Sequence, residues 1–196
     1  FIGNFGCNKN HLKDSITRIK HRGPDHISIN RNNNWNVEFC RLSINDLSSD
    51  GNQPFKVGNI TAFVNGEIYN SNDLRKKYFE NTEFISKSDS EIVPYLYKKF
   101  GIDFINYLDG MFSIVIIDDE KNKLYLIKDS IGKKPLYYNK NINCECILFS
   151  SESRLNDNNT KIDRQNLKTL LFFHFKFFDQ SVYENIHSIP PGSYLV

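Results

Sequence analysis

The sequence predicts an α+β fold in which antiparallel strands dominate and helices are interspersed. Apolar, strand-like segments recur along the chain, and two of them are joined by the short polar turn DDEKN. Helical patterns are few and do not alternate regularly with the strands, which favours an α+β or layered sandwich over a parallel doubly wound sheet. The segments expected to form strands are 36–44, 60–64, 111–117, 123–128, 135–138 and 146–151.

Three segments show the apolar spacing of helices. The second begins with a capping-box pair, Ser88 and Glu91, and ends on a glycine after two lysines. Pro94 conflicts with this helix because proline lacks a backbone N–H, so we expect a kink there. The asparagine-rich run 30–36 is expected to form a hairpin loop between strands. The expected helices are 12–20, 88–101 and 163–175.

Length and charge narrow the class of protein. The 196 residues suffice for one domain with a substantial core, and the net charge of +2 comes without a basic cluster, so we expect no nucleic-acid partner. No stretch reaches the roughly 18 apolar residues of a membrane helix, and the first residues lack the basic flank of a secretory signal. The four cysteines lack the paired spacing of a zinc site, so we expect no metal, reduced thiols and a cytoplasmic location.

Polar residues gather in four short segments whose chemistry suits a small zwitterionic ligand. Arg41 offers a forked donor pair for a carboxylate, and Glu67 or Asp89 would hold an ammonium group. Asn65 with the backbone N–H of Gly66 would form an oxyanion hole. Each feature also has a structural explanation: a surface arginine, an Asn-Gly hairpin turn, and a helix cap at 88–89. The four segments are HRGPD (21–25), CRLSIND (40–46), NGEIYN (65–70) and KSDSE (87–91).

Taken together, eight blocks resemble the class II glutamine amidotransferase domain of the asparagine synthetase family, in family order from residue 3 to 195. The resemblance implies an N-terminal-nucleophile hydrolase fold, a four-layer αββα sandwich of two antiparallel sheets. It also implies one domain over 1–196 followed by an ATP-dependent synthetase domain. ATP and Mg would bind in that second domain, and no cofactor is expected in this one. The blocks are HRGPD, RLSIND with QP at 53–54, NGEIYN, SDSE, FINYLDGMFSIVIID, KDSIGKKPLYY, FSSE and IPPGSYL.

The resemblance also implies roles for individual residues toward glutamine. Asn65 and Gly66 match the oxyanion hole. Glu67 and Asp89 match residues that contact the amino group of glutamine. The segment that grips the carboxylate end of glutamine matches Arg41, Leu42, Ser43, Ile44 and Asn45.

The opening FIGNFG differs from the family at the position of the nucleophile. The family uses an N-terminal cysteine, whose thiolate attacks the amide carbon while its own α-amino group acts as the base. The family opening Cys-Gly-x-Phe-Gly, laid on Gly3, Phe5 and Gly6, puts this cysteine at position 2, where the chain has Ile2. Ile2 has no nucleophilic atom, so we expect glutamine hydrolysis to be lost, unless the N-terminus is trimmed or engineered. Cys7 carries no free α-amino group and is not expected to substitute.

Three hypotheses about function remain open. The chain is the amidotransferase-like half of an asparagine-synthetase-type amide ligase with a silent glutaminase, which would use free ammonia or another amine. β-Lactam synthetases resemble this architecture and lack glutaminase chemistry. Alternatively it is a non-catalytic module that binds glutamine or a related amino acid, or a scaffold that packs against the synthetase domain. An unused pocket has no physical reason to keep a desolvated arginine and two acids, which weighs against the scaffold.

Overall fold

Two antiparallel sheets form the framework of the computed structural model, which describes residues 1–6, 12, 15–141, 146–155, 161–175 and 179–196. Sheet A has the strand order β10-β8-β9-β1-β3-β2, and sheet B has the order β11-β7-β6-β5-β4. The strands of sheet A are β1 (Ile2–Phe5), β2 (His26–Arg31), β3 (Trp35–Arg41), β8 (Tyr137–Asn141), β9 (Cys146–Ser150) and β10 (His187–Ser188). Those of sheet B are β4 (Phe55–Val57), β5 (Ile60–Ile68), β6 (Gly110–Asp118), β7 (Lys123–Lys128) and β11 (Tyr194–Leu195).

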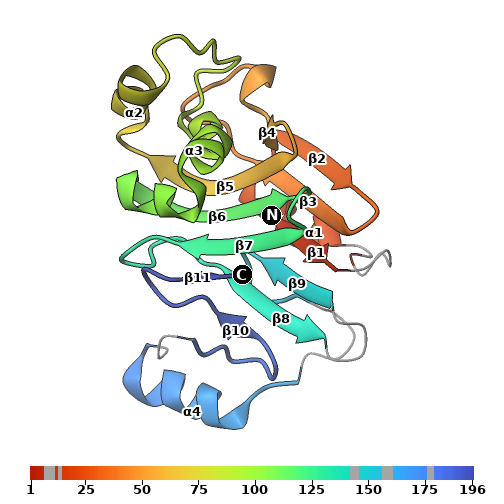
Figure 1. Cartoon of the computed structure of the whole chain (residues 1–196). Helices are drawn as coiled ribbons and strands as arrows, with labels where there is room; N and C mark the ends of the chain where they lie inside the picture. The colour runs from red at the N-terminus through yellow and green to blue at the C-terminus, as the bar shows by residue number, and fades with distance from the viewer. Residues whose placement is uncertain (7–11, 13–14, 142–145, 156–160, 176–178) are drawn as a thin grey trace.

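Short helices surround the sheets, and Figure 1 shows α2 and α3 at the end of the molecule opposite α4. The side chain of Asp163 caps α4 by accepting the backbone N–H groups of Gln165 and Asn166. The α-helices are α1 (Ser15–Ile19), α2 (Ser71–Tyr78), α3 (Ile92–Phe100) and α4 (Arg164–Phe173). The 3-10 helices are η1 (Lys20–Arg22), η2 (Ser49–Gly51), η3 (Asp89–Glu91) and η4 (Gly101–Tyr107).

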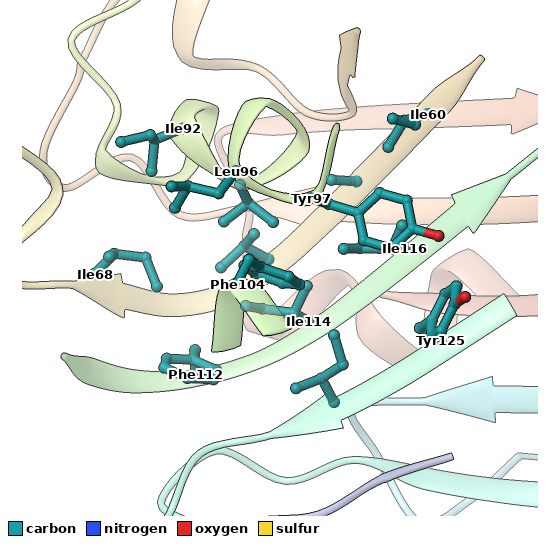
Figure 2. Packing of buried hydrophobic residues seen from close by; sticks show 14 of the residues in the cluster. Ile60, Ile68, Ile92, Leu96, Tyr97, Phe104, Phe112, Ile114, Ile116 and Tyr125 are labelled. Atoms are coloured by element: carbon teal, nitrogen blue, oxygen red, sulfur yellow. The ribbon is translucent and has the colours of Figure 1, made fainter. Parts of the chain in front are cut away.

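Side-chain alternation along the strands builds three apolar clusters and so defines four layers. The outer face of sheet B packs under α2, α3 and η4, with Ile114, Leu96 and Phe104 at its centre (Figure 2). A second cluster fills the space between the sheets, where Phe63 of β5 lies near Phe39 of β3. A third, smaller cluster joins the outer face of sheet A to α1. This confirms the predicted αββα sandwich of two antiparallel sheets.

Most of the predicted helices and strands are present. Their observed ends differ from the predicted ones where pairing between strands far apart in the chain sets the length of a strand, as in β5. The helix expected over 88–101 begins as η3 and becomes α-helical only at Ile92, so Pro94 lies in the first turn and needs no kink. Of the expected capping box, the Ser88 half is confirmed, since its hydroxyl accepts the N–H of Ser90 at 3.4 Å, and the Glu91 half is wrong. The Glu91 carboxylate instead accepts the N–H groups of residues 85 and 86, at 2.9 and 2.8 Å. The run 30–36 does contain a hairpin connection, between β2 and β3.

The cysteines do not all follow the expectation of reduced thiols. Cys40 is free and buried on β3. Cys146 is disulfide-bonded. Cys7 and the Cys144-Glu145 pair lie outside the described part of the chain. Within the part that the structure describes, no group of His, Cys, Asp and Glu side chains is arranged to hold a metal ion, and no helix has the length and apolarity to cross a membrane.

Candidate functional site

A cavity of about 440 Å³ opens where β1 begins, and the polar segments singled out from the sequence meet there. The end of β3 and the loop after it form one wall, and the second half of β5 with η3 forms another. These segments are far apart in the chain, and the pairing of strands within the two sheets brings them together. The predicted site residues that line the cavity are Arg41, Leu42, Ile44, Asn45, Asn65, Gly66, Glu67 and Asp89.

Arg41 is the last residue of β3, and its guanidinium is buried beside the cavity rather than exposed on the surface. Nη1 donates to the carbonyl of Ser48 and to Oδ1 of Asn52, each at 2.8 Å, and Nη2 donates to the carbonyl of Asp46. These acceptors are neutral, and none of the ion pairs found among the described residues includes Arg41. A desolvated cation at a cavity wall whose described hydrogen bonds go to neutral oxygens is a good receptor for a ligand carboxylate.

Asn65 and Gly66 lie inside β5, which excludes the hairpin-turn explanation of this Asn-Gly pair. The pairing with β6 runs without interruption from Ile60 to Ile68, and the N–H of Tyr69 donates to the carbonyl of Asp109 just beyond it. Antiparallel neighbours alternate between bonded and non-bonded pairs, so the odd residues of β5 direct their backbone groups to β6 and the even ones away from it. The N–H of Gly66 is therefore directed away from β6, at a position that lines the cavity.

Glycine is required at position 66 by the close approach of β6. Gly66 has φ +148°, and a Cβ there would lie 2.0 Å from the carbonyl oxygen of Met111. The side chain of Asn65 reaches the hydroxyl of Ser113 on β6, with an Nδ2–Oγ distance of 3.5 Å. The amide of Asn65 and the N–H of Gly66 are thus two donors on neighbouring residues of one cavity wall, as an oxyanion hole needs.

Asp89 is held firmly at the edge of the cavity by two donors from different segments. Its Oδ2 accepts the N–H of Ile68 at 2.6 Å, and its Oδ1 accepts Nδ2 of Asn45 at 3.1 Å. Glu67 is half-buried on the same wall. These two carboxylates supply the negative charge that an ammonium group at this end of the cavity would need.

Two carboxylates accept hydrogen bonds from the loop after β3 and its neighbours. Oδ2 of Asp25, from the HRGPD segment, accepts the N–H of Ser43 at 2.7 Å. Ser43 is the member of the predicted set 41–45 that does not line the cavity. The Asp46 carboxylate accepts the hydroxyl and the N–H of Ser48, and these bonds, with one from the N–H of Lys87, lower the pKa of Asp46.

The structure places the side chains of Phe1 and Ile2 on opposite faces of sheet A. Phe1 lines the cavity and packs between the sheets near Phe39 and Phe149, with ring centroids 6.5 Å apart in both pairs. Ile2 is buried in the cluster under α1 and does not line the cavity. The position that the family opening assigned to the nucleophile is thus directed away from the site, and Phe1 is the cavity-facing residue of the two.

The α-amino group of Phe1 is fully buried at the cavity and donates to Oγ of Ser151 at 3.1 Å. Burial lowers the pKa of this amine from its ordinary 8.0 to about 5; the nearby guanidinium of Arg22 lowers it further, and the carboxylate of Glu152 opposes the shift. The amine is therefore neutral at pH 7. Burial also raises the pKa of the Cys40 thiol, which lies with Ile2 in the cluster under α1 and is protonated at pH 7.

The HRGPD segment contributes to the cavity mouth through charges that pair with the FSSE block. The Glu152 carboxylate lies 3.5 Å from Nε2 of His21 and 3.4 Å from Nε of Arg22. Gly23 allows the segment to approach β3, since a Cβ there would lie 2.4 Å from the backbone of Arg41.

Several cavity-lining residues carried no site assignment from the sequence. Cys40 and Phe1 belong to strands whose apolar pattern predicts core residues, and only the tertiary structure shows that they reach the cavity. Gln53 stood in the QP block of the family pattern without a role of its own. The others that line the cavity without an assigned role toward the ligand include Asp46, Ser88, Ser90, Met111, Lys134 and Ser151.

Solved structures of other proteins share this sandwich. The glutamine phosphoribosylpyrophosphate amidotransferase from B. subtilis superimposes with a TM-score of 0.64 over 78% of this chain and 41% of that chain, at 16% sequence identity. A structure described as the allosteric regulatory enzyme of purine biosynthesis superimposes with a TM-score of 0.61 over 99% of this chain and 46% of that chain, at 14% identity. Likeness at such low identity establishes the fold alone.

The sequence itself places the chain in a family. The model of the glutamine amidotransferase domain matches residues 2–196, so the chain belongs to this family. It is 42% identical over 134 residues to asparagine synthetase [glutamine-hydrolyzing] 2 of Bacillus subtilis, which is 67% of this chain and 18% of the relative. It is 35% identical over 179 residues to asparagine synthetase of Sandersonia aurantiaca, and 33% identical over 189 residues to amidase chry2 of Gibberella zeae. These matches cover 90% and 94% of this chain, and 31% and 28% of the relatives. The chain therefore spans less than a third of the length of these relatives.

Proposed function

We propose that the chain is the glutamine-binding domain of an asparagine-synthetase-type, ATP-dependent amide-forming enzyme, and that with Phe1 as its first residue it does not hydrolyse glutamine. The relatives named glutamine-hydrolysing asparagine synthetases support the first part. The ATP, the Mg and the acceptor substrate would bind in the further domain of the whole protein.

The charge pattern of the cavity carries the proposal for glutamine. The buried guanidinium of Arg41 would take the α-carboxylate, and Asp89 with Glu67 would take the α-ammonium group. The N–H of Gly66 and the amide of Asn65 would then donate to the side-chain carbonyl oxygen. The cavity combines a desolvated cation, two carboxylates and a backbone N–H directed into it. These groups complement the carboxylate, the ammonium and the side-chain amide of one amino-acid amide.

The second part of the proposal rests on the first two residues. Hydrolysis in this family needs a thiolate at the cavity and a neutral amine that takes the proton of the thiol. The buried amine of Phe1 has the lowered pKa that suits such a base. The side chain beside it is a phenyl ring, and Ile2 lies on the opposite face with an alkyl side chain. With Phe1 as the first residue, its amine would serve as the base, and neither side chain would supply the nucleophile.

Glutamine binding and hydrolysis are tested on one sample of the chain, with Phe1 as its first residue. Titration calorimetry measures binding of glutamine, and a coupled assay measures ammonia release. We expect saturable binding that is lost in Arg41→Met, with ammonia release at the level of the buffer. Ammonia release at a rate typical of enzymes would contradict the proposed loss of hydrolysis. The absence of binding by a folded chain would contradict the glutamine site and favour a scaffold that packs against the synthetase domain.

A further inference from the structure

The outer edge of β5 has a strand partner over only part of its length. β4 pairs with β5 from Val57 opposite Ile60 to Phe55 opposite Ala62, and the pairing ends there. The next residues whose backbone groups are directed to this edge are Val64, Gly66 and Ile68, by the alternation set out above. A strand edge without a partner leaves N–H and C=O groups that need other acceptors and donors.

Gln53 takes the place of the missing strand at Val64. Its Oε1 accepts the N–H of Val64 at 2.6 Å, and its Nε2 donates to the carbonyl of the same residue at 2.9 Å. One side-chain amide thus reproduces the pair of hydrogen bonds that a neighbouring strand would make. The bonds are buried, where they are not in competition with water.

Gln53 is itself anchored to the other sheet. Its carbonyl oxygen accepts the hydroxyl of Ser28 on β2 at 2.7 Å, so this residue joins the edge of sheet A to the edge of sheet B. The residue is buried and lines the cavity. Two residues beyond Gly66, the Asp89 carboxylate takes the N–H of Ile68. Side chains therefore fix the edge on both sides of Gly66.

We propose that Gln53 is a positioning residue for the oxyanion donor: its amide clamps Val64 so that the N–H of Gly66, two residues further along, stays aimed into the cavity. This inference rests on the proposed glutamine site, because the value of an aimed N–H lies in its bond to the carbonyl oxygen of the ligand. Gln53 acts through the backbone of β5, and the ligand is held by the residues already described.

The clamp itself is tested without any ligand, by amide hydrogen exchange of the chain. In the parent chain we expect slow exchange at Val64 and faster exchange at Gly66. In Gln53→Met, which keeps the side-chain length and removes both polar groups, we expect exchange at Val64 to become at least tenfold faster. Unchanged protection of Val64 in this variant would overturn the proposal, whether or not the chain binds glutamine.

The consequence for the ligand is tested by calorimetry with L-glutamine. We expect the Kd of Gln53→Met to rise about tenfold or more, because a donor that drifts from its acceptor loses most of its bond. The matched control is Asn70→Leu. The Asn70 amide makes a similar two-point clamp to the backbone, to the carbonyl of Tyr107 at 2.9 Å and the N–H of Asp109 at 3.0 Å, and does not line the cavity. We expect this control to lose stability and keep its Kd.

The outcomes separate the inference from the proposed function. If the parent chain binds no glutamine, the proposed function fails, and the exchange experiment still decides the clamp. If Gln53→Met exposes the Val64 amide to exchange and leaves the Kd for glutamine unchanged, the positioning role is overturned. It is also overturned if Asn70→Leu raises the Kd as much as Gln53→Met does. Should Gln53→Met fail to fold, Gln53→Glu decides. Its carboxylate can still accept the N–H of Val64 and cannot donate to the carbonyl, so we expect Val64 to stay protected and the Kd to rise several-fold. An unchanged Kd in this variant overturns the proposal.

Discussion

In a chain whose first residue is Phe1, the buried α-amine predicts that the free energy of unfolding depends on pH between 5 and 8. Its pKa falls from 8.0 to about 5 on folding, a difference of about three units, because burial disfavours the charged form. At about 1.36 kcal/mol per unit this corresponds to about 4 kcal/mol. The unfolded chain binds one more proton at this site between the two pKa values, so the free energy of unfolding rises with pH through this window. Below pH 5 both states are protonated, and the loss of about 4 kcal/mol is complete.

The assay is urea unfolding from pH 5.0 to 8.5 on the chain with Phe1 as its first residue. The control is the same chain acetylated at the α-amino group, which removes this one titration and keeps every histidine and carboxylate. We expect the free energy of unfolding of the parent chain to fall by about 4 kcal/mol more than that of the acetylated chain between pH 8.5 and 5. Equal slopes in the two chains would refute the reasoning and show that the amine stays accessible to water in the folded state.

Three further predictions follow from the site. Gly66→Ala should lower the free energy of unfolding by roughly 2–6 kcal/mol in urea titrations, since its Cβ would meet the Met111 carbonyl at an unfavourable φ; a change below 1 kcal/mol would contradict this. Asp89→Asn keeps an acceptor for the backbone, so we expect nearly unchanged stability and a glutamine Kd raised roughly 10- to 100-fold in calorimetry; an unchanged Kd would remove this carboxylate from the site. Extending the chain by Cys-Gly before Phe1 should raise ammonia release about tenfold or more, because the added thiol would reach the cavity. Ile2→Cys should not raise it, because the side chain at position 2 is directed at α1. Equal ammonia release by both variants would contradict the placement of Phe1 and Ile2 on opposite faces of sheet A.

The extension follows from the register of β1. Ile2 lies opposite Glu38 of β3, so a residue two positions before Phe1 would lie opposite Arg41, at the cavity. Alternation would direct its side chain to the same face as Phe1. An Ala-Gly extension is the matched control, since it adds the same backbone and a free amine without the thiol.

Much of the fold could be read from local pattern. Apolar strand-like runs located β6 and β7 to within a residue, and the polar turn between them marked their hairpin. The asparagine-rich run marked the connection of β2 and β3 in the same way. These features depend on neighbours in the chain, which is why one sequence suffices to predict them.

The sequence by itself determined which residue types carry the chemistry: one arginine at a strand end, an Asn-Gly pair and two acids. The tertiary structure alone decided where they lie. Because β5 pairs with β6 through Asn65 and Gly66, this Asn-Gly pair lies within a strand and not in the hairpin turn that its sequence indicates. The register of β1 between β3 and β9 placed Phe1 at the cavity and Ile2 on the other face. The clamp by Gln53 joins residues of two sheets. The physical reason is that strand register and sheet packing depend on contacts between segments far apart in the chain. No local sequence pattern specifies which strand pairs with each edge.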